Sequence, residues 1–426
     1  MATYRWIPIT DSSEWDTFVT EAAGPCDTSH FAAYHEVAQS LGDAYVGGGG
    51  VPFLFAYEDG DLRIAVPLLR RTIARIPGLE SFDGWYDATN AYGYPGLLVN
   101  CRDMTLFQNG ANSQDVANPQ DGTNPQNGTN TQALLSPWDQ MESQESTFWR
   151  HKLDERERFQ RAFFAAMREL RIVSFFGRGN PLIPGEVFWY EGMADVRRTG
   201  RTVAMDLTLP DSDQLRQMRR DTRARLRQAI DAGVTVRRSI PSPNGSIPAD
   251  DLTHFIRLYE CTMRSVGAAA GYYFDRSYYE SLFRRLGPSH TALLFSEYED
   301  APIAGAIFLL SGTAESHPPG AAIIQYHLSG SVTDERTRRF GGGTRPILDH
   351  MRRWGREHGY RWLHMGGGVG GRGPGDSLFD FKAGFSRRSF DFYTVRWITD
   401  PERYGMFVDR GGSIQTDFFP RYRWVR

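Results

Sequence analysis

The chain has 426 residues, of which 40% are hydrophobic and 23% are charged, and its net charge is −3. That length predicts two or three domains, and the composition is that of a soluble globular protein rather than a disordered or fibrous one. No apolar run reaches the roughly 18 residues of a membrane span, and no secretory signal is visible. Three widely spaced cysteines exclude a disulfide framework and paired-cysteine zinc sites, so we expect a reduced, cytoplasmic protein.

Arginine outnumbers lysine to an unusual degree. Of the 48 basic residues only Lys152 and Lys382 are lysines. In a chain that has replaced nearly every lysine, a remaining one is a candidate for chemistry that arginine cannot supply, because arginine holds its proton too tightly. Lys152 lies in a highly charged helix start, where a solvated position is the favoured interpretation.

The first hundred residues are typical of a mixed α/β unit. Two β-rich runs within residues 53–69 flank a Glu-Asp-Gly-Asp turn, which predicts a hairpin. Residues 108–132 are rich in Asn, Gln, Gly and Thr, so we expect a mobile insertion over about 108–147. A helix is predicted to follow over residues 148–170.

Residues 201–207 predict a strand, and residues 213–232 predict a helix that ends at Gly233. One stripe of this helix carries four arginines: Arg216, Arg220, Arg223 and Arg227. The stripe is either a solvated face or a surface that contacts the phosphates of a polyanion such as tRNA.

The remaining elements alternate in an order that indicates an α/β acyltransferase. Two helices and three strands precede a glycine loop, a helix over 344–358 and a final strand at 360–365. The loop contains Arg338, Gly341 and Gly343, and its R-x-x-G-x-G pattern resembles the pyrophosphate loop of the GNAT acyltransferase superfamily. Glycine amides before a helix N-terminus favour phosphate binding.

Five sequence blocks stand out: Leu363-His-Met-Gly-Gly-Gly368, Asp376-Ser-Leu-Phe-Asp-Phe-Lys382-Ala-Gly-Phe385, Tyr326-His-Leu-Ser-Gly-Ser331, the 87–96 segment and the helix, turn and strand of residues 219–236. Together they resemble the Fem-type (FemABX-like) aminoacyltransferases, over roughly residues 30–105 and 195–395. The resemblance implies an α/β fold with two GNAT-like domains in tandem, each a mixed, mostly antiparallel sheet flanked by helices. We expect the first domain over 1–198, the second over 199–388, and a C-terminal segment, 389–426, that returns to the first.

The resemblance also implies a reaction. Members of the family transfer an aminoacyl group from aminoacyl-tRNA to an amine. For this chain we expect such a transfer, without a cofactor, to a small-molecule amine, for example in natural-product biosynthesis, or to a peptidoglycan precursor. Lys382 is then expected to stabilise the oxyanion and to protonate the leaving ribose oxygen. A surface ion pair of Lys382 with Asp376 or Asp380 is the structural alternative.

Asp87 is the second catalytic candidate, because a carboxylate there can orient the acceptor amine or accept its proton. A turn-capping role is the alternative. His327 also lies in an apolar strand, where a buried core histidine is the more common outcome. The expected substrate-binding residues are Tyr92, Tyr94, Asp376, Phe381 and His327.

Two other functions stay open. The Arg338–Gly343 loop can serve an acyl-CoA-dependent N-acyltransferase, and a catalytically inactive tandem GNAT protein can bind tRNA or a partner. The arginine of Thr262-Met-Arg264 stands one position earlier than in the corresponding Fem-type block. A contact of this arginine with the diphosphate of a peptidoglycan precursor is therefore in doubt. The sequence has no HExxH and no Cys/His cluster, so no metal is expected. We expect a monomer or a weak dimer.

Overall fold

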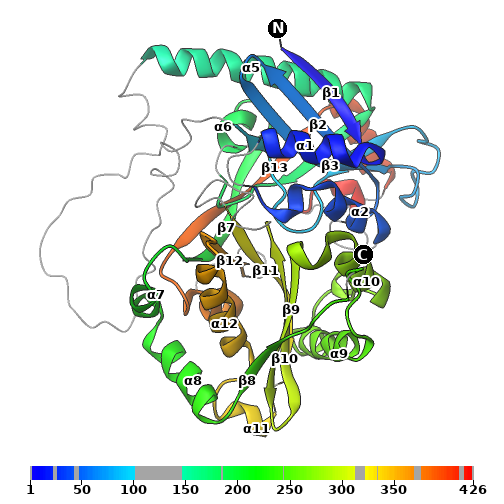
Figure 1. The fold of residues 1–426 in the computed structure, drawn as a ribbon. Helices are drawn as coiled ribbons and strands as arrows, with labels where there is room; N and C mark the ends of the chain where they lie inside the picture. The colour runs from blue at the N-terminus through cyan, green and yellow to red at the C-terminus, as the bar shows by residue number, and fades with distance from the viewer. Residues whose placement is uncertain are drawn as a thin grey trace, which may run out of the picture.

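The computed structural model describes residues 2–22, 26–42, 48–100, 146–183, 186–242, 244–311, 322–332, 334–368, 376–411 and 417–424. They form two lobes, one above the other in Figure 1, and long strands run between the lobes. The insertion expected over about 108–147 lies outside these ranges except for the start of helix α5 (Ser146–Glu169). None of the helices in the described ranges has the length and apolarity to cross a membrane.

One sheet passes through both lobes, and thirteen of its strands fall in the described ranges. The upper lobe holds, in spatial order, β1 (Thr3–Pro8), β2 (Val51–Asp59), β3 (Leu62–Thr72), β4 (Tyr86–Thr89), β6 (Ile172–Arg178) and β13 (Ser389–Ile398), with β5 (Leu98–Val99) beside β3. The order continues into the lower lobe with β7 (Asp195–Asp206), β12 (Trp362–Gly367), β11 (Ile323–Ser331), β10 (Ala301–Leu310), β9 (Thr291–Tyr298) and β8 (Thr235–Arg238).

Two strand pairs in this otherwise antiparallel sheet are parallel, β4 with β6 and β11 with β12. The β11–β12 pairing runs only from Ile323 opposite Trp362 to Gln325 opposite His364. Both strands continue beyond that point, β11 to Ser331 and β12 to Gly367, and β12 there pairs with β7. The two strands therefore separate after Gln325 and His364, and the candidate site lies where they part.

The upper lobe buries both faces of its sheet. In β2, Phe55 and Tyr57 pack against α5, whereas Leu54 and Ala56 belong to the core beneath helix α1 (Ser12–Glu21). Alternate residues of a strand point to opposite faces of the sheet. Because both faces are buried here, successive residues of β2 are apolar. The predicted hairpin is confirmed, because β2 pairs antiparallel with β3.

The lower lobe is covered by helices on both faces. Helices α9 (Ala249–Ser265) and α10 (Arg276–His290) cover one face, and α12 (Thr344–Glu357), with α8 (Arg220–Asp231) against it, covers the other. Helix α2 (Ala32–Ser40) of the upper lobe packs on α10. The lobes share a hydrophobic core there, which holds them together as one body.

The helix predicted over 213–232 is two helices, α7 (Asp211–Gln217) and α8. The break falls at Met218 and Arg219, which adopt extended backbone conformations. Met218 is buried in the lower-lobe core, and the Arg219 amide donates to the Gly384 carbonyl at 2.8 Å. A tertiary hydrogen bond and a buried side chain thus override the local helical pattern.

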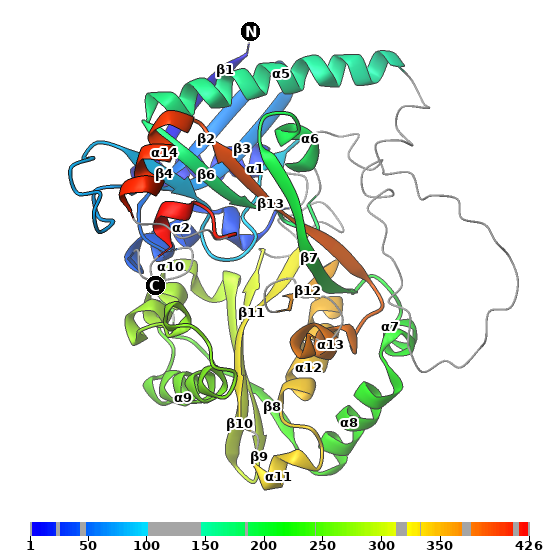
Figure 2. The ribbon, with the colours of Figure 1, turned by 180° about the vertical axis from the view of Figure 1, so that it is seen from behind.

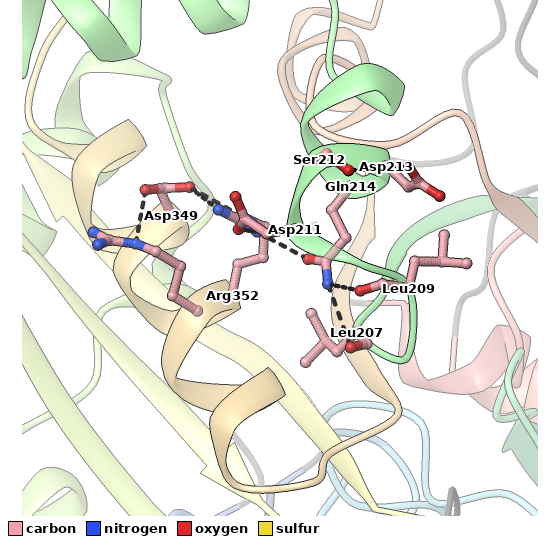
Figure 3. A network of polar contacts seen from close by, with 9 residues as sticks. Leu207, Leu209, Asp211, Ser212, Asp213, Gln214, Asp349 and Arg352 are labelled. Atoms are coloured by element: carbon pink, nitrogen blue, oxygen red, sulfur yellow. Dashed lines mark hydrogen bonds and ion pairs between the residues drawn. The ribbon is translucent and has the colours of Figure 1, made fainter.

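Helix α7 is fixed to α12 by a buried arginine (Figure 3). Arg352 is 1% exposed and donates to Asp349 at 2.8 and 3.0 Å, to Asp211 at 2.6 Å and to Gln214 at 3.1 Å. The Gln214 amide in turn donates to the carbonyls of Leu207 and Leu209. All three nitrogens of this rigid guanidinium are bonded, so Arg352 fixes the position of α7, and with it the start of the α7–α8 segment, relative to α12.

The chain returns to the upper lobe after the lower one is complete. Strand β13 lies between β6 and β7, and helix α14 (Pro401–Arg410) contacts β6 (Figure 2). Because β7 and β13 both run through the junction, the domain boundaries at residues 198 and 388 stay predictions.

Candidate active site

Three glycines stand at the end of strand β12, where the backbone conformation of Gly366 and the crowding at Gly367 and Gly368 disfavour side chains. Gly366 has φ = +75°, and a β-carbon there would lie 3.4 Å from the Lys382 Nζ and 3.5 Å from the Tyr94 hydroxyl. A β-carbon on Gly368 would overlap the Asp376 carboxylate. The glycines therefore let a lysine and a tyrosine from distant parts of the chain approach the same stretch of backbone.

Lys382 lies on a short helix, α13 (Ser377–Ala383), that packs against β12 and β7. Asp376 caps this helix by accepting from the amides of Leu378 and Phe379, each at 3.1 Å. The Lys382 side chain is 8% exposed, and its Nζ donates to the Gly367 carbonyl at 2.6 Å. The structure thus places Lys382 in the interior beside the end of β12, rather than in a surface ion pair.

Burial changes the acidity of Lys382. It lowers the pKa of the ammonium to about 8, although the nearby Asp376 carboxylate opposes the shift. A buried cation near one carboxylate and one carbonyl is less stabilised than in water, so it releases its proton more readily. Near neutral pH the group is still a cation and can act as a proton donor.

The Tyr92-Gly-Tyr94 turn reaches this site from the upper lobe. Asn90 anchors the turn: its side chain donates to the Pro67 carbonyl at 2.8 Å and accepts from the Arg178 amide at 2.7 Å. The hydroxyl of Tyr94 accepts from the Gly367 amide at 3.4 Å, so Tyr94 and Lys382 both bond the same peptide segment. Asn90 is a positioning residue that the sequence did not single out.

Buried polar atoms without partners gather around the same turn. The Gln325 Oε1, the His327 Nδ1 and both ring nitrogens of His364 are buried with no hydrogen-bond partner in the described ranges. The rings of Tyr92 and His327 are 5.7 Å apart, and those of Tyr94 and His364 are 5.0 Å apart. Unsatisfied buried groups are rare in folded proteins and are common where a polar ligand binds.

Both histidines are neutral. Burial lowers the pKa of His327 to about 3, and burial together with the Lys382 charge lowers the pKa of His364 to about 3. His327 hydrogen-bonds through its Nε2 with the Tyr278 hydroxyl at 2.9 Å, which leaves only its Nδ1 available. The structure therefore brings His327 to the site as a neutral polar group and adds Gln325 and His364, which were not among the predicted substrate-binding residues.

Asp87 is not available as a base. It is fully buried in β4, and its two oxygens accept from the guanidinium groups of Arg71, at 2.9 Å, and Arg423. Burial alone would raise its pKa, but Arg423 and Arg71 outweigh burial and lower it. A carboxylate held by two cations is a poor proton acceptor, so this pairing favours a structural role that ties the C-terminal segment to β4. The expected catalytic role of Asp87, which includes orienting the acceptor amine, stays a prediction.

Phe381 and Asp376 support the site. The Asp376 carboxylate holds the first turn of α13, as described above. Phe381 packs against Phe385, with ring centroids 5.5 Å apart, and the Arg345 guanidinium lies 5.1 Å from its ring. Phe381 therefore faces Arg345 and the glycine loop before α12.

The glycine loop turns inward. After the short helix α11 (Glu335–Arg338), the amides of Gly341 and Gly342 donate to the carbonyls of Arg338 and Thr337, at 3.1 and 3.0 Å. These two amides are thus used within the loop and do not converge on an external phosphate. A β-carbon on Gly343 would overlap the Ser296 side chain, so that glycine serves close packing.

The basic helix lies beside this loop. Arg216, Arg220 and Arg227 are exposed, whereas Arg223 is partly buried and donates to the Leu215 carbonyl at 3.1 Å. A β-carbon on Gly341 would lie 3.3 Å from the Arg225 side chain and 3.0 Å from that of Arg345. The structure therefore places α8 beside the loop through Arg225 and Arg345, which were not predicted, and it separates Arg216, on α7, from the other three arginines of the predicted stripe.

In the described ranges, no group of three or more His, Cys, Asp or Glu side chains is arranged to hold a metal ion.

No protein-family model and no curated protein matches the sequence. Among solved structures, FemX is similar with a TM-score of 0.56 at 13% identity, over 95% of this chain and 99% of FemX. A tandem GNAT protein from the clavulanic acid biosynthesis pathway aligns with a TM-score of 0.43 at 12% identity, over 94% of this chain and 99% of that protein. The similarity to FemX confirms the predicted FemABX-like tandem GNAT fold. At this identity it establishes the fold alone.

Proposed function

We propose that this protein is an aminoacyltransferase that moves an aminoacyl group from aminoacyl-tRNA to the amine of a small molecule or a peptidoglycan precursor. One observation carries the proposal: Lys382 is a buried cation among polar atoms that lack partners. The resemblance of residues 363–368 and 376–385 to the Fem-type motifs supports it, as does the fold shared with FemX.

The proposed reaction is a direct attack. The acceptor nitrogen bonds to the ester carbonyl carbon, the bond from that carbon to the ribose oxygen breaks, and the nitrogen loses one proton. The Lys382 ammonium stabilises the intermediate oxyanion and donates a proton to the departing ribose oxygen. The proton lost by the nitrogen passes to water, and water reprotonates the lysine, so proton count and charge balance without a covalent enzyme intermediate.

The basic surface supports a tRNA donor. Helix α8 begins where the Arg219 amide bonds Gly384, one residue after the end of α13, which carries Lys382. The Arg219 side chain also donates to the Asp380 carbonyl at 3.4 Å. Exposed arginines on α8 can contact tRNA phosphates while the tethered end of the helix holds α13 beside the site.

An acyl-CoA donor is the second candidate and has less support. Its pyrophosphate would need outward-facing amides in the 338–343 loop, and two of these amides are bonded inside the loop. The third candidate, an inactive protein that binds tRNA, does not account for a buried lysine with a lowered pKa.

The test is transfer from a pool of charged tRNAs to a panel of amines, followed by mass spectrometry. We expect amide products that disappear when the tRNA is digested with RNase before mixing. Acyl-CoA donors, tried in parallel, should give no product. Product formation that survives RNase, or that requires acyl-CoA, would show that the donor assignment is wrong.

A further inference from the structure

Arg178 is the last residue of β6, and its guanidinium has no counter-ion in the described ranges. Its amide donates to the Asn90 side chain, and its guanidinium lies 5.1 Å from the ring of Phe176. In the part of the chain that the structure describes, its side chain makes no hydrogen bond or ion pair, and its Nη1 is buried without a partner. The residue as a whole is partly buried.

The neighbours that act electrostatically on Arg178 are tyrosines, and the Glu186 carboxyl lies beside the next residue, Gly179. Burial lowers the pKa of Arg178, and the neighbours that act electrostatically against this shift are Tyr272, Tyr92, Tyr94 and Tyr34. The Tyr34 hydroxyl donates to the Tyr92 carbonyl at 2.7 Å, and the rings of Tyr92 and Tyr272 are 6.3 Å apart. Neutral phenols do not compensate a buried positive charge, so an anion brought by a ligand would be strongly favoured there.

We propose that Arg178 binds a carboxylate of the acceptor, so that the acceptor is an amino acid or a short peptide whose amine attacks beside Lys382. The inference rests on the proposed function for the identity of the ligand. Tyr94 connects the two positions, because the Arg178 amide bonds Asn90, which anchors the turn that carries Tyr94, and Tyr94 bonds the same backbone segment as Lys382. A molecule that carries both a carboxylate and an amine can therefore bind Arg178 through the carboxylate and present its amine near Lys382, with Tyr94 between the two groups.

The shape of the guanidinium favours a carboxylate. Arginine presents parallel N–H groups that match the two carboxylate oxygens, and this bidentate geometry is what a lysine would not reproduce. Phosphate is the other anion that arginine binds well. The basic residues expected to contact donor phosphates lie in the lower lobe, on α7, α8 and the loop before α12, whereas Arg178 lies in β6 of the upper lobe, which favours the acceptor as the source of the anion at Arg178.

The test measures binding without any donor. Acetate and glycylglycine, each compared with its amide, and inorganic phosphate are titrated into the protein by calorimetry. We expect the carboxylates to bind about 10- to 100-fold more tightly than their amides, and Arg178→Gln to abolish that preference. Arg178→Lys should keep only part of it. Arg161→Gln, at an exposed arginine of α5 paired with Glu157, is the matched control and should bind like the original protein.

Each outcome decides one point. Equal binding of carboxylates and amides by the original protein, or an undiminished preference in Arg178→Gln, overturns the inference. Arg178-dependent binding of phosphate without binding of carboxylates also overturns it. Aminoacyl transfer that proceeds without any role for Arg178 leaves the proposed function intact. Arg178-dependent carboxylate binding with no transfer from any donor supports the carboxylate site and contradicts the aminoacyltransferase proposal.

Discussion

Two regions of the molecule bury charged groups in opposite ways. At the α7–α12 contact Arg352 bonds through all three guanidinium nitrogens, and in β4 Asp87 is held by two arginines. At the junction of the lobes, Arg178 has no counter-ion in the described ranges, and Lys382 is buried beside a carbonyl. Compensated charges hold the fold, whereas an uncompensated buried charge lowers stability and is retained where a ligand or a reaction needs it.

The largest expected effect is on stability, at Asp87. Asp87→Asn leaves Arg71 and Arg423 without their carboxylate and should reduce the free energy of unfolding by about 3–5 kcal/mol. Urea denaturation measures it. Glu157→Gln, which removes an exposed partner of Arg161, should change stability by less than about 0.5 kcal/mol. Full stability combined with lost transfer would mean that Asp87 acts in catalysis after all.

Lys382 should show the reverse pattern. Lys382→Met is expected to lower kcat by about 10²- to 10³-fold, because a group that stabilises the oxyanion is lost. Its stability should be unchanged or higher, since a buried charge is replaced by an apolar side chain of similar length. Single-turnover transfer and urea denaturation provide the two measurements. Lys152→Met, at the other lysine, removes an ion pair with Glu155 and should retain full activity; a fully active Lys382→Met would refute the proposed role.

A buried carboxyl with one donor should make stability depend on pH. Glu186, on helix α6 (Glu186–Tyr190), accepts from the Leu97 amide at 2.7 Å, and burial raises its pKa from 4.5 to about 7. The folded protein keeps this proton to about pH 7, whereas the unfolded chain releases it near 4.5. Stability should therefore fall by about 3 kcal/mol as pH rises through that window.

The matched variant for this effect is Glu186→Gln, which resembles the protonated side chain. It should lack the loss, so its unfolding free energy should equal that of the original protein near pH 4 and exceed it above about pH 7. Parallel stability curves for the two proteins would contradict the raised pKa. The comparison with Asp87 is direct, because the pKa shifts of these two buried carboxyls have opposite signs.

The rate of transfer should fall at alkaline pH. Lys382 loses its proton above a pKa of about 8, so kcat should drop about tenfold for each pH unit above that value. Lys382→Arg keeps the positive charge but does not titrate in this range, so its lower rate should lack the alkaline decline. A decline that persists in Lys382→Arg would have to come from another group.

The smallest expected effect is at Tyr94. Tyr94→Phe removes the hydroxyl that accepts from the Gly367 amide at 3.4 Å, while the packing of the ring against His364 remains. The loss of one neutral hydrogen bond corresponds to a decrease of about 2- to 10-fold in kcat/KM. Steady-state kinetics with a fixed acceptor measure it, and a loss as large as that of Lys382→Met would mean that the phenol takes part in proton transfer.

Local patterns predicted much of the fold. The 53–69 hairpin and the helix at 344–358 could be predicted from the sequence, because β-alternation and helical periodicity are properties of neighbouring residues. The helix over 213–232 was predicted without its break, because the bond from Arg219 to Gly384 joins residues far apart in the chain. Ile230, an apolar residue within that predicted helix, is 52% exposed, because tertiary contacts set the direction of the helix after the break.

The sequence by itself determined the fold class, through motifs that resemble the Fem-type family, and it singled out Lys382 through its composition. Only the tertiary structure decided the state of each charged group. Asp87 meets Arg423 across more than three hundred residues, and Tyr94 of the upper lobe bonds the same end of β12 as Lys382. Arg178 and Gln325 carry no sequence signature, because their importance lies in partners that are missing. The physical reason is that pKa and pairing depend on burial and on distances in space, which local sequence does not contain.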